Sequence, residues 1–114
     1  MKNMHSILIA DDEKHVRNDI IQSMHWSDYG FYIIGEAENG RQALQMIQDL
    51  QPDVLITDIK MPFANGLKLI ESAHQIKPDI QCDIISGYED FHYDQEAIRK
   101  VKTFLPIPHS IRSF

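Results

Sequence analysis

The stretch "SILIADDE", residues 6–13, decides the fold, because it joins an uninterrupted apolar run to a cluster of acids. The run "ILIA", residues 7–10, contains no polar break, which is typical of a strand that is buried on both faces. Such strands occur in parallel sheets whose two faces are covered by helices. The acids that follow directly, Asp11, Asp12 and Glu13, therefore stand at the carboxyl end of a predicted central strand.

The rest of the chain alternates apolar runs with segments of helical period. Further strands are predicted at residues 31–37, 53–58, 82–86 and 101–105, and helices at 16–24, 39–50, 65–76 and 91–100. Asn39 is expected to cap the second helix, and Pro78 to end the third at Lys77. Strands separated by helices predict a five-stranded, mainly parallel, doubly wound α/β sheet of order 2-1-3-4-5. Only six residues follow Pro108, so we expect a truncated or altered last helix.

The composition predicts one domain over residues 1–114. The formal net charge of −6 argues against direct nucleic-acid binding, which needs a basic surface. The single cysteine, Cys82, excludes an internal disulfide, and no apolar run approaches the ~20 residues of a membrane span. We therefore expect a cytoplasmic protein that does not interact with membranes.

Acidic side chains are expected at the carboxyl ends of two neighbouring strands. Asp11 and Asp12 follow the first strand and Asp58 ends the third, and these strands are adjacent in the predicted order. Ligands of doubly wound sheets bind at this switch point, and three carboxylates placed together suit Mg²⁺. The alternative is that the acids after the first strand only favour the dipole of the first helix.

Three segments together resemble the receiver domain of two-component response regulators. They are "ILIADDE" (residues 7–13), "DVLITDIKMPFANGL" (53–67) and "IISGYEDF" (84–91). Residues 26–44 and 86–93 further resemble receivers that are joined to AraC-type DNA-binding domains. The resemblance implies a flavodoxin-like fold and a signalling protein, not an enzyme. It also implies phosphorylation by a sensor histidine kinase and control of transcription through an output domain outside this chain.

The resemblance also implies roles for the acidic residues. Asp58 corresponds to the phosphoacceptor. Asp12 and Asp58, together with the backbone carbonyl of Lys60, would bind Mg²⁺ directly, and Asp11 would hold the ion mostly through water. This arrangement is chemically reasonable, because phosphoryl transfer depends mainly on positioning and charge neutralisation.

Two further positions correspond to the parts of a receiver that sense the phosphoryl group. Ser86 matches the switch hydroxyl and Phe104 the switch aromatic, although alone they would be interpreted as a turn residue and a core residue. The face of the fourth helix and the fifth strand is the family's usual surface for homodimers.

The chain departs from the family pattern near its end. Receivers carry a lysine just before the proline that follows the fifth strand, whereas Ile107 precedes Pro108 here. Lys102 is a poor substitute, because it lies roughly 16 Å away along a strand and on the opposite face. The alternative function is therefore a degenerate receiver-like interaction module that is not productively phosphorylated.

Three other residues carry structural expectations. Trp26 should cover the end of the first helix, and Cys82 should be a small core residue. Asp83 falls inside a strand that should be buried, where a carboxylate without partners is costly.

Overall fold

The computed structural model of the chain describes residues 4–58 and 65–85, and all of these except Ile85 with their side chains. The helix expected at residues 91–100 and the strand expected at 101–105 lie outside the described residues.

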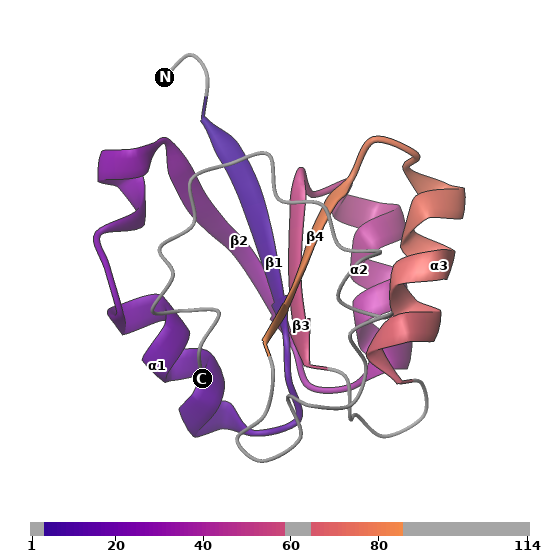
Figure 1. Cartoon of the computed structure of the whole chain (residues 1–114), viewed down its shortest axis with the longest axis horizontal. Helices are drawn as coiled ribbons and strands as arrows, with labels where there is room; N and C mark the ends of the chain where they lie inside the picture. Colours follow the sequence, from indigo (N-terminus) through magenta and orange to yellow (C-terminus); the bar gives the residue numbers. More distant parts are fainter. Residues whose placement is uncertain (1–3, 59–64, 86–114) are drawn as a thin grey trace.

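The described residues form a parallel α/β sheet with helices on both faces (Figure 1). The strands have the order β2-β1-β3-β4, which confirms the predicted order as far as the structure describes the chain. The elements are β1 (His5–Ala10), α1 (Lys14–Gln22), a 3₁₀ turn η1 (Trp26–Tyr29), β2 (Phe31–Ala37), α2 (Gly40–Leu50), β3 (Val54–Asp58), α3 (Gly66–Ile76) and β4 (Gln81–Ile85).

The register of β1 and β3 brings their carboxyl ends to the same edge of the sheet. Ile7 pairs with Val54 at one end of the ladder, and Ala10 pairs with Thr57 at the other. Asp11 and Asp58 are therefore the next residues along two adjacent strands. The edge at which the acids were expected is thus set by strand pairing.

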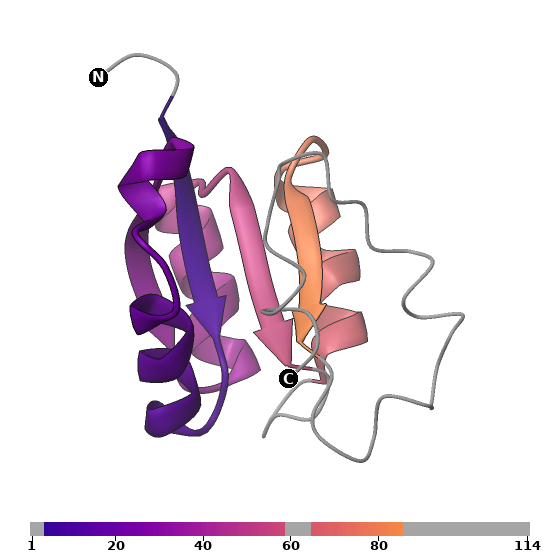
Figure 2. The same cartoon turned by 60° about the vertical axis from the view of Figure 1, so that its left-hand side comes forward.

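The apolar run of β1 supplies both faces of the sheet, as expected for a buried parallel strand. Ile7 and Ile9 face α1, whereas Leu8 and Ala10 face α2 and α3. The view in Figure 2 separates these two layers, with α1 on one side of the sheet and α2 and α3 on the other. This two-sided burial makes β1 the centre of the fold.

Local sequence signals determine where the helices begin and end. Asn39 caps α2 by accepting a hydrogen bond from the Gln42 N–H at 2.8 Å, which confirms the prediction. Asn65 caps α3 in the same way, through the Lys68 N–H at 2.9 Å. Lys77, before Pro78, is extended and ends α3.

The three structural expectations are also confirmed. Trp26 is buried and donates its indole N–H to the carbonyl of Ile20 at 3.2 Å, which covers the end of α1. Cys82 is buried in the core, and Asp83 is only 6% exposed. Among the helices of residues 4–58 and 65–85, none has the length and apolar character needed to cross a membrane.

Candidate metal and phosphoryl site

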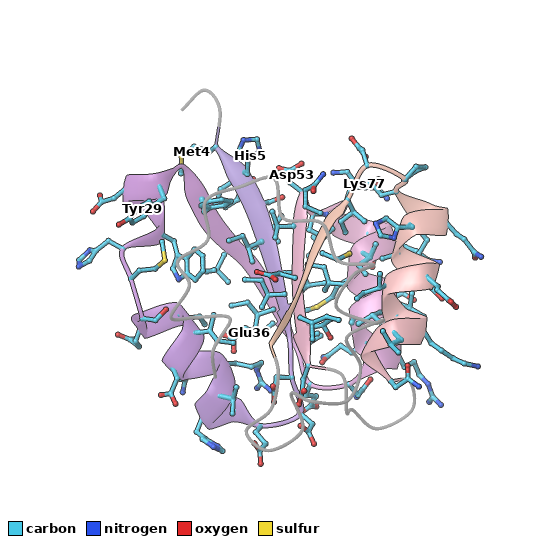
Figure 3. All side chains as sticks on the ribbon, in the orientation of Figure 1. Met4, His5, Tyr29, Glu36, Asp53 and Lys77 are labelled. Carbon is cyan, nitrogen blue, oxygen red and sulfur yellow. The ribbon has the colours of Figure 1, made fainter. Side chains whose placement is uncertain are left out.

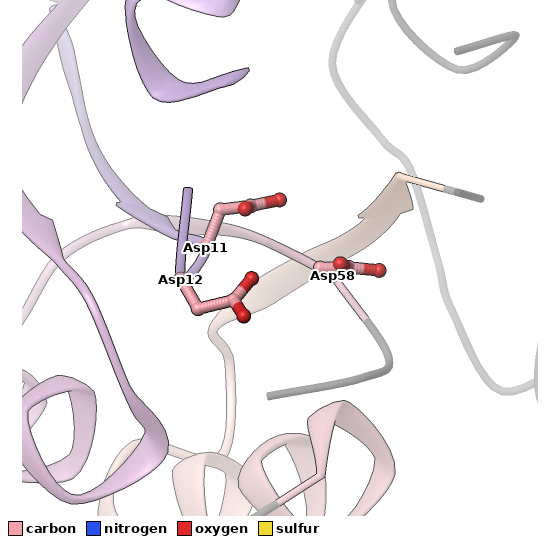
Figure 4. Close-up of side chains that lie close together, drawn as sticks. All are labelled: Asp11, Asp12 and Asp58. Atoms are coloured by element: carbon pink, nitrogen blue, oxygen red, sulfur yellow. The ribbon is translucent and has the colours of Figure 1, made fainter. Parts of the chain in front are cut away.

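The carboxylates of Asp11, Asp12 and Asp58 converge at the carboxyl edge of the sheet (Figure 4). One oxygen from each of them lies within 4.8 Å of the others. Asp11 and Asp12 follow β1, and Asp58 ends β3, so the adjacency of these two strands brings the acids together. The structure thus bears out the expected convergence of these three residues.

Asp11 is the buried member of this group, being 2% exposed. Its backbone N–H donates to the Ala37 carbonyl at 3.0 Å, and its carboxylate accepts the Glu13 N–H at 2.8 Å. The pKa of the Asp11 carboxyl is raised to about 7, mainly by burial and also by the charges of Asp58 and Asp12, against the opposing effect of the Glu13 hydrogen bond. A cation at this position would offset both the cost of burying the Asp11 charge and its repulsion from the neighbouring carboxylates.

The donor set fits one Mg²⁺ ion. This ion prefers oxygen ligands at about 2.0–2.1 Å, so ligands on opposite sides of it lie about 4.2 Å apart. The three carboxylate oxygens all lie within 4.8 Å of one another, a limit that is comparable with this separation. The idea that the acids serve only the first helix is insufficient, because no acid lies in the first turn of α1 and the side chain of Glu13 does not cap it.

The structure adds a basic residue to this edge that the sequence did not reveal. The guanidinium of Arg17, on α1, donates from Nη1 to the backbone carbonyl of Asp11 at 2.7 Å and from Nε to Glu36 on β2 at 2.9 Å. The Arg17 side chain is only 11% exposed. No sequence motif links Arg17 to Asp11. The contact between them forms because α1 packs beside the end of β2.

Several sequence-predicted residues lie outside the described residues. They are Lys60, Ser86, Phe104 and Ile107. Their predicted roles stay predictions, and the described part of the site consists of the three acids and the contacts that hold them.

Comparison with known proteins identifies the class to which this fold and this acidic edge belong. Residues 7–105 match the response regulator receiver domain, so the chain belongs to that family. It is a two-component receiver domain, a signalling protein and not a classical enzyme.

Among individual proteins, the chain is similar to transcriptional regulators. The chain is 38% identical over 106 residues to the transcriptional regulatory protein YesN of Bacillus subtilis, covering 92% of this chain and 29% of YesN. It is also 38% identical to the transcriptional regulatory protein HptR of Staphylococcus aureus, over 84% of this chain and 37% of HptR. The chain thus spans well under half of these curated relatives.

Solved structures show the same likeness. The receiver domain of AraT, a response regulator from Geobacillus stearothermophilus, superposes with a TM-score of 0.79 at 38% identity, covering 84% of this chain and 74% of that one. A two-component transcriptional regulator AraC from Clostridium phytofermentans gives a TM-score of 0.71 at 35% identity, over 79% and 73% of the two chains. The resemblance to receivers of AraC-type regulators is therefore confirmed.

Proposed function

We propose that this chain is the phosphoacceptor part of a transcriptional response regulator, phosphorylated on Asp58 by a partner sensor histidine kinase in a Mg²⁺-dependent reaction. The convergence of Asp11, Asp12 and Asp58 is the observation that carries the proposal. Phosphoryl transfer to a carboxylate needs positioning and neutralisation of negative charge, which a cation between these acids supplies.

The acids take different roles in this proposal. Asp58 is the nucleophile, since it ends β3 and is less buried than Asp11. Asp12 is exposed and, with Asp58 and the carbonyl of Lys60, holds Mg²⁺ directly. Asp11 is buried and already accepts the Glu13 N–H, which suits an indirect hold on the ion through water.

The remaining parts of the proposal follow from the family and from the relatives. Residues 1–114 form one receiver domain in the cytoplasm, in which Ser86 and Phe104 respond to the phosphoryl group. The fourth helix and the fifth strand form a face for homodimers. An output domain beyond this chain binds DNA, as the names of the transcriptional relatives suggest. The formal net charge of −6 argues against direct DNA binding by the receiver itself.

The test is an intact-mass measurement after incubation with a small phosphodonor and Mg²⁺. Wild type should gain the mass of one phosphoryl group, and Asp58→Asn should gain none. Asp53→Asn is the matched control, because Asp53 precedes β3 at the opposite edge of the sheet from Asp58, so this variant should be phosphorylated like wild type. A folded wild-type protein without an adduct would refute the proposal.

One feature of the sequence favours a second function. Ile107 stands where receivers carry a lysine, and an ammonium bonded to a charged group contributes about 1.5–3 kcal/mol. In this second function, the chain is a degenerate receiver-like interaction module that binds a partner without productive phosphorylation. An adduct that forms on Ile107→Lys but not on wild type would support this second function over the first.

A further inference from the structure

Arg17 connects three parts of the chain at the acidic edge of the sheet. It lies on α1, contacts the peptide that follows β1 through the Asp11 carbonyl, and contacts β2 through Glu36. Glu36 pairs in register with Ile9 and lies one residue before the end of β2, close to the carboxyl edge of the sheet. We propose that Arg17 is a positioning residue that sets the orientation of Asp12 for the Mg²⁺ site. This inference rests on the proposed function.

The physical basis is the planarity of a single peptide. The Asp11 carbonyl belongs to the peptide that joins Asp11 to Asp12, and that peptide is planar. The preceding peptide is anchored to β2, because the Asp11 N–H donates to the Ala37 carbonyl at 3.0 Å. Arg17 holds the carbonyl of the next one at 2.7 Å. Asp12 is exposed, so its direction depends on this peptide more than on packing of its own side chain.

Glu36 in turn holds Arg17 in place. Its carboxylate accepts the Arg17 Nε–H at 2.9 Å, and the fork of a guanidinium lets Nη1 reach the Asp11 carbonyl at the same time. The pair also balances its own charge, so the guanidinium does not add a net positive charge beside the cation site. The Arg17–Glu36 pair therefore acts on Asp12 through geometry.

Charge and geometry predict opposite results when Arg17 is removed. Loss of a positive charge, with Glu36 left negative, should tighten the binding of a divalent cation. Loss of the contact with the Asp11 carbonyl should weaken cation binding. Mutation of groups that orient metal ligands typically lowers metal affinity by about 10–100-fold. A weaker affinity in Arg17→Met would consequently have a geometric cause.

The opposite edge of the sheet offers a matched control. Lys77 donates to the Asp53 carboxylate at 3.1 Å and to the Gln51 carbonyl at 3.0 Å, and its side chain is 17% exposed. It thus bonds one carboxylate and one carbonyl, as Arg17 does. Figure 3 places Lys77 and Asp53 at the end of the sheet where the strands begin. Lys77→Met removes the same charge without touching the acidic edge.

The experiment is a Mg²⁺ titration of the chain, followed by the amide resonances of residues 11–13, for wild type, Arg17→Met, Arg17→Lys and Lys77→Met. We expect Arg17→Met to bind about 10-fold more weakly than wild type. The Mg²⁺ affinity of Arg17→Lys should lie between those of wild type and Arg17→Met, and the affinity of Lys77→Met should equal that of wild type. In metal-free protein, Arg17→Met should shift the Asp12 amide more than Lys77→Met does.

Each result has one meaning. Wild type without Mg²⁺-dependent shifts would overturn the proposed metal site and this inference with it. Wild-type binding together with equal or tighter binding by an Arg17 variant would overturn this inference alone. Equal weakening in Arg17→Met and Lys77→Met would also overturn it, because general loss of stability would then explain both. If Arg17→Met does not fold, Arg17→Lys keeps the charge and decides the question by the same comparison.

Discussion

Replacing Asp11 by asparagine should stabilise the metal-free protein at neutral and alkaline pH. Asparagine has the same shape, and its side-chain oxygen can still accept the Glu13 N–H that Asp11 accepts at 2.8 Å. It removes the negative charge that burial and the nearby Asp58 and Asp12 carboxylates disfavour. The native carboxylate at this position thus lowers the stability of the metal-free protein.

The pKa of Asp11 sets the size and the pH range of this effect. Burial, with the neighbouring charges, raises the folded-state pKa from 3.8 to about 7. Between these values the folded state binds more protons than the unfolded state, so stability falls as the pH rises and the loss is complete above about pH 7. A difference of about three pH units corresponds to at most about 4 kcal/mol. Asp11→Asn should raise the free energy of unfolding by between about 1 and 4 kcal/mol at about pH 8. At about pH 4 it should have almost no effect.

The assay is urea unfolding in the presence of a chelator, followed by the fluorescence of Trp26, the single tryptophan. The matched control is Asp53→Asn. Burial alone would raise the pKa of Asp53, but hydrogen bonds from Ser6 and Lys77 outweigh it and lower the pKa. Asp53 stabilises the fold above its unfolded pKa, so this variant should lose stability at about pH 8. If Asp11→Asn is no more stable than wild type at that pH, burial and repulsion do not destabilise the Asp11 carboxylate as expected.

Three further predictions concern the caps and the metal. Asn39→Ala should lower the free energy of unfolding by about 1 kcal/mol, because the Gln42 N–H loses its acceptor. Urea unfolding would measure this loss, and an unchanged stability would show that the cap is unimportant. Trp26→Phe should lower the free energy of unfolding by about 0.5–1.5 kcal/mol, because the Ile20 carbonyl loses the indole N–H but keeps the Ser23 hydroxyl and amide as donors. Thermal unfolding followed by circular dichroism would show an unchanged midpoint if the indole contact were unimportant. Mg²⁺ should raise the unfolding midpoint more at about pH 8 than at about pH 5, because protons compete for Asp11 below its pKa of about 7; equal shifts at both pH values would argue against Asp11 taking part.

Much of the fold was readable from local patterns. The apolar run at residues 7–10 identified the central strand, because a strand without polar breaks must be buried on both faces. Asn39 and Pro78 marked helix ends through effects that act within a few residues. The alternation of strands and helices predicted a parallel sheet, and the described strands are parallel and have the expected order.

The contacts around the acids were not readable in the same way. Arg17 reaches the Asp11 carbonyl and Glu36 because three elements pack together, and no spacing in the sequence indicates that meeting. The clamp of Lys77 on Asp53 likewise joins the end of α3 to the residue before β3. Such contacts depend on packing between elements that are distant in the sequence, so only the folded structure shows which residues meet.

The sequence by itself determined which chemical groups this protein offers at the carboxyl ends of two apolar strands, namely the carboxylates of Asp11, Asp12 and Asp58. Those identities need no coordinates. The tertiary structure decided how the acids act together, since the parallel pairing of β1 and β3 places their oxygens within 4.8 Å. It also decided that Asp11 is buried, and burial raises its pKa to about 7. The physical reason is that repulsion and desolvation depend on distance and solvent exposure, which a chain acquires only when it folds.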